Sequence, residues 1–262
     1  MDHAAGRLRP LEHAHRGAPL PPGGGTMSIV RRVYGLRWMV LPPLVGVGVL
    51  GMIVGAVVVA PREAVEGDVQ RLMYIHLPSA QAMYLAFGVV FVASIMVLWK
   101  HDMRWDAIAR GAASVGVLFT GFTLVTGSLW GKPIWGTYWQ WDARLTSTLI
   151  LFLVYAAYML ARAVSDTSDE QAARYSAVYA IVGFLDVPLI VMSVRWWRTL
   201  HPQPIVSRTD PQLPEGMLIV LLISTLAILL LTTWLILLRT DTERLGQRLL
   251  GLRAAADRRE EA

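Results

Sequence analysis

Six long apolar segments dominate the sequence and limit what the chain can fold into. Each contains roughly 18 to 23 residues, long enough for a helix to cross a hydrocarbon layer of about 30 Å. Backbone amides inside a bilayer must pair within their own segment, which favours helices. The sequence therefore predicts an all-α polytopic membrane protein with six transmembrane helices. The segments lie near residues 38–60, 79–99, 107–129, 145–164, 175–195 and 216–238.

The composition agrees with a membrane protein and excludes several kinds of site. Of the 262 residues, 55% are hydrophobic and only 16% are charged, which is more apolar than a soluble core of this size requires. The chain contains no cysteine, so disulfides, thiolate metal sites, thiol catalysis and cofactor attachment through cysteines are excluded. The net charge of +5 lies mostly at the termini and in short loops, so we expect no nucleic-acid partner.

Charge and composition also suggest how the chain is organised across the membrane. Residues 1–30 form an Arg-, Pro-, Gly- and His-rich tail that is predicted to be disordered, with Met27 as an alternative start. Residues 31–240 form the six-helix domain, and 241–262 form a second tail. Both tails and the connections on their side hold 17 of the 24 Lys and Arg residues. Because basic loops stay in the cytoplasm, we expect both termini to be cytoplasmic.

The outward segment 130–147 is unusually rich in aromatic residues. Gly131, Pro133 and Gly136 interrupt it, so it is predicted to be a loop and not part of a spanning helix. Its rings could anchor the chain at the headgroup level, or they could form a flat apolar platform for a planar ligand. An anchor needs one or two rings, so the number favours the platform. The rings belong to Trp130, Trp135, Tyr138, Trp139 and Trp141.

Two histidines flank this loop from separate outward segments. His76 precedes Pro78 and is expected at the membrane surface, in the first turn of the second span. His201 follows the end of the fifth span. Each alone would more often be an ordinary loop histidine. Together with aromatic rings, two neutral imidazoles are what a six-coordinate haem iron requires. A zinc site would need more ligands, and a haem buried within the bilayer would need histidines inside the spans.

Several charged residues near these segments have both a ligand-binding and an ordinary interpretation. Arg144, Arg198, Lys132 and Arg71 could pair with anionic haem propionates, although basic residues near span ends also extend to lipid headgroups without any ligand. Asp142 is predicted to cap the fourth helix and could pair with Arg144. These residues define the edge of the candidate site.

Asp186 is a carboxylate inside the fifth span, just before Pro188. An intramembrane carboxylate is a functional candidate by default. A protonated or hydrogen-bonded group inside the bundle is an equally good interpretation.

The pattern Trp-Gly-x-Pro-x-Trp-Gly-x-x-Trp-x-Trp-Asp-x-Arg-Leu-Thr-Ser at 130–147 resembles that of the Trp-rich haem-handling proteins. Tyr74-Ile-His-Leu-Pro78 and the segment from Ser193 to His201 extend the likeness. Within that group, the chain resembles the cytochrome c maturation protein C family, also called haem exporter protein C. The likeness runs from about Val33 to Leu238. The larger haem-lyase relatives have many more spans than this chain.

The resemblance implies a role in c-type cytochrome assembly. Such proteins hold a non-covalent, b-type haem transiently at the periplasmic face of the bacterial inner membrane. They present it to a membrane-anchored haem chaperone, cytochrome c maturation protein E. They work beside the ATPase and permease subunits of an ABC transporter and a small single-span protein. The resemblance assigns the axial ligands to His76 and His201, and the signature tryptophans to Trp130, Trp135, Trp139 and Trp141.

Four positions depart from the family pattern. Tyr138 replaces a tryptophan, Gln81 an aromatic residue, Asp186 an asparagine and Pro202 a glutamine.

Delivery of haem to a chaperone is the main functional hypothesis. Two others remain: a transporter that itself moves haem across the bilayer, and a structural subunit of an ABC-type complex. No nucleophile–base pair or phosphate-binding loop is present in the sequence, so we do not expect an enzyme.

Overall fold

The computed structural model describes residues 25–165, 170–202 and 213–260. Within these ranges the regular elements are helices: α1 (Gly25–Val54), η1 (Gly55–Val59), η2 (Asp68–Leu72), α2 (Met73–Lys100), α3 (Met103–Trp135), α4 (Ala143–Val164), α5 (Glu170–Phe184), α6 (Asp186–Trp196) and α7 (Glu215–Glu260). Six helical segments are long and apolar enough to cross a membrane. The predicted all-α, six-span fold is confirmed. Of the tail 1–30 that was predicted to be disordered, residues 1–24 lie outside the described residues, and residues 25–30 belong to α1.

The chain divides into two units, Met1–Val40 and Leu41–Ala262, and the division falls within α1. Pro42 and Pro43 follow directly. Because α1 begins at Gly25, both prolines lie inside the helix. A proline inside a helix removes a backbone hydrogen bond and crowds the preceding turn.

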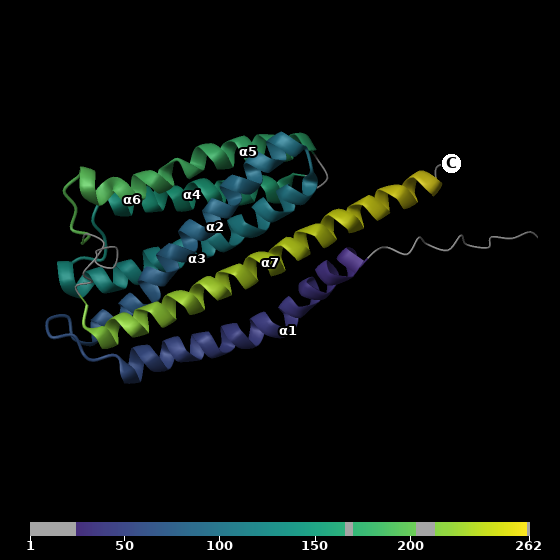
Figure 1. Ribbon diagram of the computed structural model, residues 1–262. Coiled ribbons are helices and arrows are strands. Elements are labelled where there is room, and N and C mark those ends of the chain that lie inside the picture. The colour runs from purple at the N-terminus through teal and green to yellow at the C-terminus, as the bar shows by residue number, and fades with distance from the viewer. Residues whose placement is uncertain (1–24, 166–169, 203–212, 261–262) are drawn as a thin grey trace, which may run out of the picture. The chain divides into compact units, whose positions relative to one another are not determined.

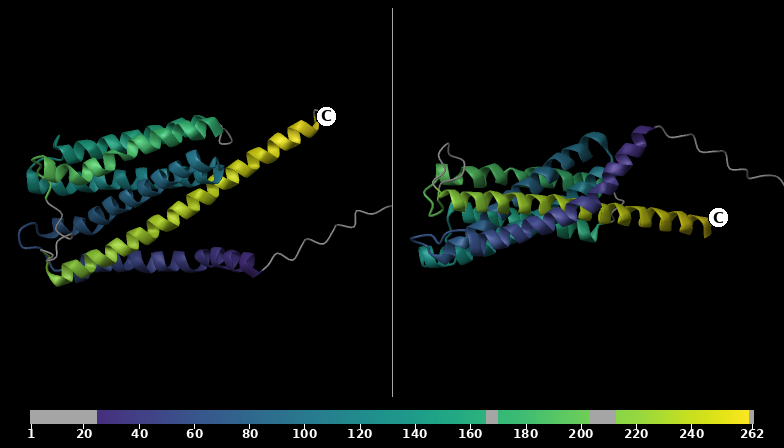
Figure 2. Two further views of the ribbon diagram at one scale, coloured as in Figure 1. Left: turned by 45° about the horizontal axis from the view of Figure 1, so that its top comes forward. Right: turned by 60° about the horizontal axis from the view of Figure 1, so that its bottom comes forward.

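In the second unit, α2 and α3 lie side by side at the centre (Figure 1). α7 packs against both, while α4 packs on α3 and α5 packs on α2. Figure 2 shows the same helices in two further views. Phe87 of α2 stacks on Tyr155 of α4 at a centroid distance of 4.0 Å. Gly116 of α3 makes room for this pair, because a Cβ there would lie 2.5 Å from Phe87 Cε1. Small residues thus allow the close helix packing typical of membrane bundles.

The fifth span is broken, although the sequence predicted one helix over 175–195. α5 ends at Phe184 and α6 begins at Asp186. Pro188 explains the break, because a proline ring conflicts with the carbonyl four residues earlier, which belongs to Phe184. Asp186 therefore lies at the start of α6.

The aromatic segment also differs from its prediction as a loop over 130–147. α3 continues through Trp130 to Trp135, and α4 begins at Ala143, so the loop is only 136–142. Pro133 lies in the last turns of α3 without ending it. The helix ends one residue after Trp135, at Gly136, whose φ of 75° is left-handed and whose amide donates to Lys132 O. Two of the four indoles are therefore fixed on a helix.

The opposite end of the bundle is held by buried charge. Arg162 of α4 and Asp106 of α3 form an ion pair of 2.7 Å, and each side chain is only 2% exposed. Arg110 of α3 pairs with Glu243 of α7 at 2.9 Å. These contacts connect three spans at the end away from the aromatic segment.

Candidate functional site

His76 and His201 meet at one end of the bundle. Their ring centroids lie 6.4 Å apart with an angle of 34° between the ring planes. His76 belongs to the first turn of α2, and His201 lies in the segment that follows α6. The two sequence-predicted ligands, 125 positions apart, are thus brought together. We call this end, formed by His76, His201 and residues 130–142, the tryptophan end.

The imidazole of His76 is buried, with a residue exposure of 8%. The helical structure begins before it, at η2, so His76 packs against α3. Its Nδ1 lies 3.1 Å from Thr126 Oγ1. The Thr126 hydroxyl donates its single proton to Phe122 O at 2.6 Å, so it can only accept from His76. Nδ1 therefore carries the hydrogen, and Nε2 keeps its lone pair.

The backbone of α3 forms the wall behind this ring. A Cβ on Gly127 would lie 3.0 Å from His76 Cε1. Glycine at this position lets the imidazole lie directly on the helix. Its orientation is thus set from two neighbouring positions of α3.

His201 is held by the start of α4. Its backbone amide donates to Thr199 Oγ1 at 3.1 Å, and the Thr199 hydroxyl donates to the Asp142 carboxylate. Asp142 also accepts from Leu145 N at 2.8 Å, which confirms its predicted role as the cap of α4. Burial, together with the positive charge of Arg144, lowers the pKa of His201 to about 4. The imidazole is consequently neutral at physiological pH.

Arg144 contacts this imidazole directly. Its Nη1 lies 3.2 Å from His201 Nδ1, and its Nη2 donates to Val191 O at 3.4 Å. The same Nδ1 lies 3.3 Å from Pro202 O. Arg144 Nε is buried and has no hydrogen-bond partner within the described ranges. The guanidinium is therefore only partly satisfied at the edge of the histidine pair.

Trp130 and Trp135 border the two histidines. Trp130 meets His76 edge-on at 5.7 Å, and its Nε1 donates to Glu66 Oε2 at 2.9 Å. Trp135 lies 6.5 Å from His201, with 59° between the rings. Both indoles are thus placed to enclose an apolar ligand beside the imidazoles.

The remaining rings do not continue this enclosure as one flat platform. Trp139 and Trp141 are nearly perpendicular, at 5.6 Å and 77°, so both cannot lie flat under one planar ligand. The exposure of Trp141 is 75% and that of Tyr138 is 58%. Lys132 lies 5.2 Å above the Tyr138 ring. The flat platform expected from the sequence is replaced by rings set edge to face.

Two other candidate residues, Arg198 and Asp186, do not take part in the contacts around the histidine pair. Arg198 is exposed and has no hydrogen bond or ion pair in the part of the chain that the structure describes. Asp186 Oδ2 is buried and has no hydrogen-bond partner among the same residues.

Sequence reasoning missed Thr126, Glu66, Thr199 and Gly127. One signal could have indicated the first of them. Thr120, Thr123 and Thr126 recur every three residues in an apolar run, and all are buried. Such spacing places polar groups on one helix face. Nothing comparable in the sequence indicates Glu66 or Thr199.

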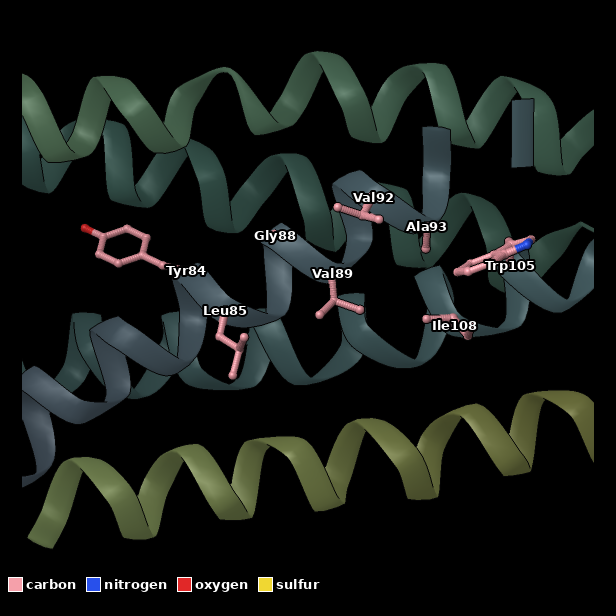
Figure 3. Close-up of a pocket in the computed structure, with 8 residues that line it drawn as sticks. All are labelled: Tyr84, Leu85, Gly88, Val89, Val92, Ala93, Trp105 and Ile108. Atoms are coloured by element: carbon pink, nitrogen blue, oxygen red, sulfur yellow. The ribbon is translucent and has the colours of Figure 1, made fainter. Parts of the chain in front are cut away.

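A separate pocket of about 500 Å³ lies along α2 and the start of α3 (Figure 3). Tyr84 and Trp105 stand at its two ends, and Gly88 lies between them. Its lining is almost entirely apolar, so it offers no metal ligand. In the described ranges, no group of three or more His, Cys, Asp or Glu could hold a metal ion. The histidine pair is therefore the candidate site.

Comparison with known proteins places this architecture in a family. A family model described as heme exporter protein C matches residues 26–254. Heme exporter protein C of Bradyrhizobium diazoefficiens is 42% identical over 226 residues, which cover 84% of this chain and 85% of the relative. The Haemophilus influenzae protein of the same name is 37% identical over 206 residues, or 78% and 81% of the two chains. The Escherichia coli K12 protein is 35% identical over 181 residues, or 67% and 72%. The chain belongs to the heme exporter protein C family.

Proposed function

We propose that the protein binds haem between His76 and His201 and passes it to a membrane-anchored haem chaperone for c-type cytochrome maturation. The observation that carries this proposal is the 6.4 Å separation of the two ring centroids. Metal–imidazole bonds are about 2 Å long, and a ring nitrogen lies about 1 Å from its ring centre. Two imidazoles on opposite sides of one metal would therefore have centroids roughly 6 Å apart. The observed separation is close to this value, which supports His76 and His201 as the two axial ligands of one iron.

The surroundings suit a cargo that is held and then released. Without cysteine the protein cannot form thioether bonds to haem, so binding would be non-covalent. Trp130 and Trp135 would contribute apolar contact, while His76 and His201 would supply the axial bonds and set the orientation. Trp141 and Tyr138 are exposed at the tryptophan end, and this is where a partner could approach.

The orientation and partners belong to the same proposal. The excess of Lys and Arg at the other end of the bundle supports a tryptophan end that faces the periplasm of a bacterial inner membrane. Family membership supports a complex with the ATPase and permease subunits of an ABC transporter, and with a small single-span protein. A mitochondrial protein of Marchantia polymorpha, 37% identical over 161 residues, is named for cytochrome c biosynthesis. We propose binding and delivery, and no catalytic role.

Absorption spectra of the purified protein test haem binding. We expect a low-spin, bis-imidazole spectrum after addition of haem. His76→Gly and His201→Gly should each lose it, and free imidazole should restore it by filling the vacated position. His101→Asn is the matched control, since His101 ends α2 at the other end of the bundle with a left-handed φ of 52°, which asparagine tolerates.

Two results would contradict the proposal. If both glycine variants keep the wild-type spectrum, the histidines do not bind the iron. If haem-loaded protein is mixed with purified chaperone in vesicles and no haem moves to the chaperone, binding would stand without delivery.

A further inference from the structure

His201 Nδ1 faces two groups with opposite requirements. The Arg144 guanidinium, 3.2 Å away, can only donate a hydrogen bond. The carbonyl oxygen of Pro202, 3.3 Å away, can only accept one. A neutral imidazole nitrogen either carries hydrogen or accepts it. Nδ1 can therefore satisfy Arg144 or Pro202, and not both together.

The charged donor should prevail in the ligand-free protein. A hydrogen bond from a guanidinium is charge-assisted and stronger than one to a neutral carbonyl. It is also the shorter of the two contacts. Nδ1 then accepts from Arg144, and the hydrogen of the neutral ring resides on Nε2. In that tautomer Nε2 has no lone pair for a metal.

His76 lacks this conflict. Thr126 holds its hydrogen on Nδ1, so Nε2 is ready to bind. The two imidazoles thus differ in whether Nε2 has a lone pair for a metal, although their positions suit one metal.

Arg144 is also short of partners of its own. Its second contact, to Val191 O, is long at 3.4 Å, and its buried Nε has no hydrogen-bond partner in the described residues. A carboxylate can accept two parallel bonds from a guanidinium. An anionic group arriving beside His201 would therefore compete well for Arg144.

We propose that Arg144 is a latch that couples recognition of a ligand carboxylate to iron binding by His201; this rests on the proposed haem function. When a carboxylate draws the guanidinium away, Nδ1 donates to Pro202 O instead. One N–H bond breaks at Nε2 and one forms at Nδ1, with exchange through solvent and no net change in protons. Nε2 then has the lone pair that binds iron. The site thus selects metalloporphyrins with free carboxylates.

The first test needs no haem. In full-length protein with ¹⁵N-labelled histidine, nitrogen chemical shifts report which ring nitrogen carries hydrogen. We expect His201 to be Nε2-protonated in the wild type and Nδ1-protonated in Arg144→Met, with His76 Nδ1-protonated in both. Arg195→Met, on an exposed arginine near the end of α6, should leave both histidines unchanged. A His201 that is Nδ1-protonated in the wild type would overturn the latch.

The second test compares haem with haem dimethyl ester, which is the same iron porphyrin without a free carboxylate. The wild type should bind haem with both histidines but bind the diester in a high-spin form through His76 alone. Its affinity for the diester should be about ten- to a hundredfold weaker, the range typical when support of a ligating histidine is lost. Arg144→Met should bind the diester in the low-spin form, because Nδ1 is free to donate to Pro202 O.

The outcomes separate the latch from the function beneath it. A low-spin diester complex in the wild type, or a high-spin one in Arg144→Met, would overturn the latch and leave haem binding intact. Absence of a bis-imidazole haem complex in the wild type would overturn the proposed function itself. If Arg144→Met does not fold, Arg144→Gln removes the charge with a polar side chain and is expected to give the same two results.

Discussion

Thr126 orients His76 because its only proton is used elsewhere. The hydroxyl donates to Phe122 O, which leaves it an acceptor toward the imidazole. A small neutral side chain inside a span can thus decide which ring nitrogen faces the ligand. The histidine could be predicted from the sequence, since its type and outward position point to iron. The spacing of the threonines could indicate the helix face on which its partner lies, but not the bond itself, because threonines in membrane helices commonly bond only to their own backbone.

Thr126→Val should weaken haem binding without preventing folding. Valine has a similar shape but no acceptor, so His76 Nδ1–H would be left buried and unpaired. Loss of such a supporting group typically costs ten- to a hundredfold in affinity. Haem titration followed by absorbance measures the change. Thr123→Val is the matched control, because the Thr123 hydroxyl donates to Phe119 O one turn earlier, and the substitution leaves the backbone of α3 in place. Equal affinities for the two variants would contradict the assigned role of Thr126.

His201 should make the stability of the ligand-free protein depend on pH. Burial lowers its pKa from 6.5 to about 4. Below pH 6.5 the unfolded chain therefore binds a proton that the folded protein resists, so stability falls as the pH drops from 6.5 toward 4. Melting temperatures in detergent at pH 7.5 and pH 5 should show a smaller loss for His201→Ala than for the wild type. A parallel loss in both proteins would show that His201 is not the group responsible.

The end of α3 is helical, although its glycine and proline content predicted a loop. Gly131, Pro133 and Gly136 read as loop residues, yet only Gly136 ends the helix. Pro133 lacks the amide hydrogen that would pair with the carbonyl of Leu129, yet α3 continues for two residues beyond it. Gly131 serves packing instead, because a Cβ there would lie 2.8 Å from Trp135 Cε3. Residue types alone cannot separate these two uses of glycine.

Gly131→Ala should therefore displace the Trp135 ring while keeping α3 helical. Alanine favours helix by about 1 kcal/mol over glycine, so the melting temperature should hold or rise even as haem affinity falls severalfold. Gly121→Ala is the control, since the nearest atom to a Cβ there is Phe152 Cε2 at 3.7 Å, an ordinary contact. Unchanged haem affinity in Gly131→Ala would show that Trp135 does not contribute to binding.

At the scale of the whole molecule, the number of spans could be predicted because bilayer thickness sets a minimum apolar length. The meeting of His76 and His201 could not be predicted from spacing, since it depends on how α2, α4 and α6 pack. The break at Leu185 could not be predicted either, because a proline inside an apolar run leaves the hydropathy of that run high. The sequence thus specifies the membrane helices, and their packing specifies the site.

The two ends of the bundle have different tasks, and this can be tested at the Asp106–Arg162 pair. Arg162→Met would leave the Asp106 carboxylate buried without its partner, which typically costs about 3–5 kcal/mol of stability. The double variant Asp106→Leu/Arg162→Met removes both charges and should recover most of the loss in melting temperature. Asp106 lies 24 residues before Trp130 on α3, or about 36 Å at 1.5 Å per residue. The haem spectrum of the folded double variant should therefore match the wild type. A double variant as unstable as Arg162→Met would show that the pair does more than neutralise buried charge. An altered haem spectrum in the double variant would show that the two ends of the bundle are coupled.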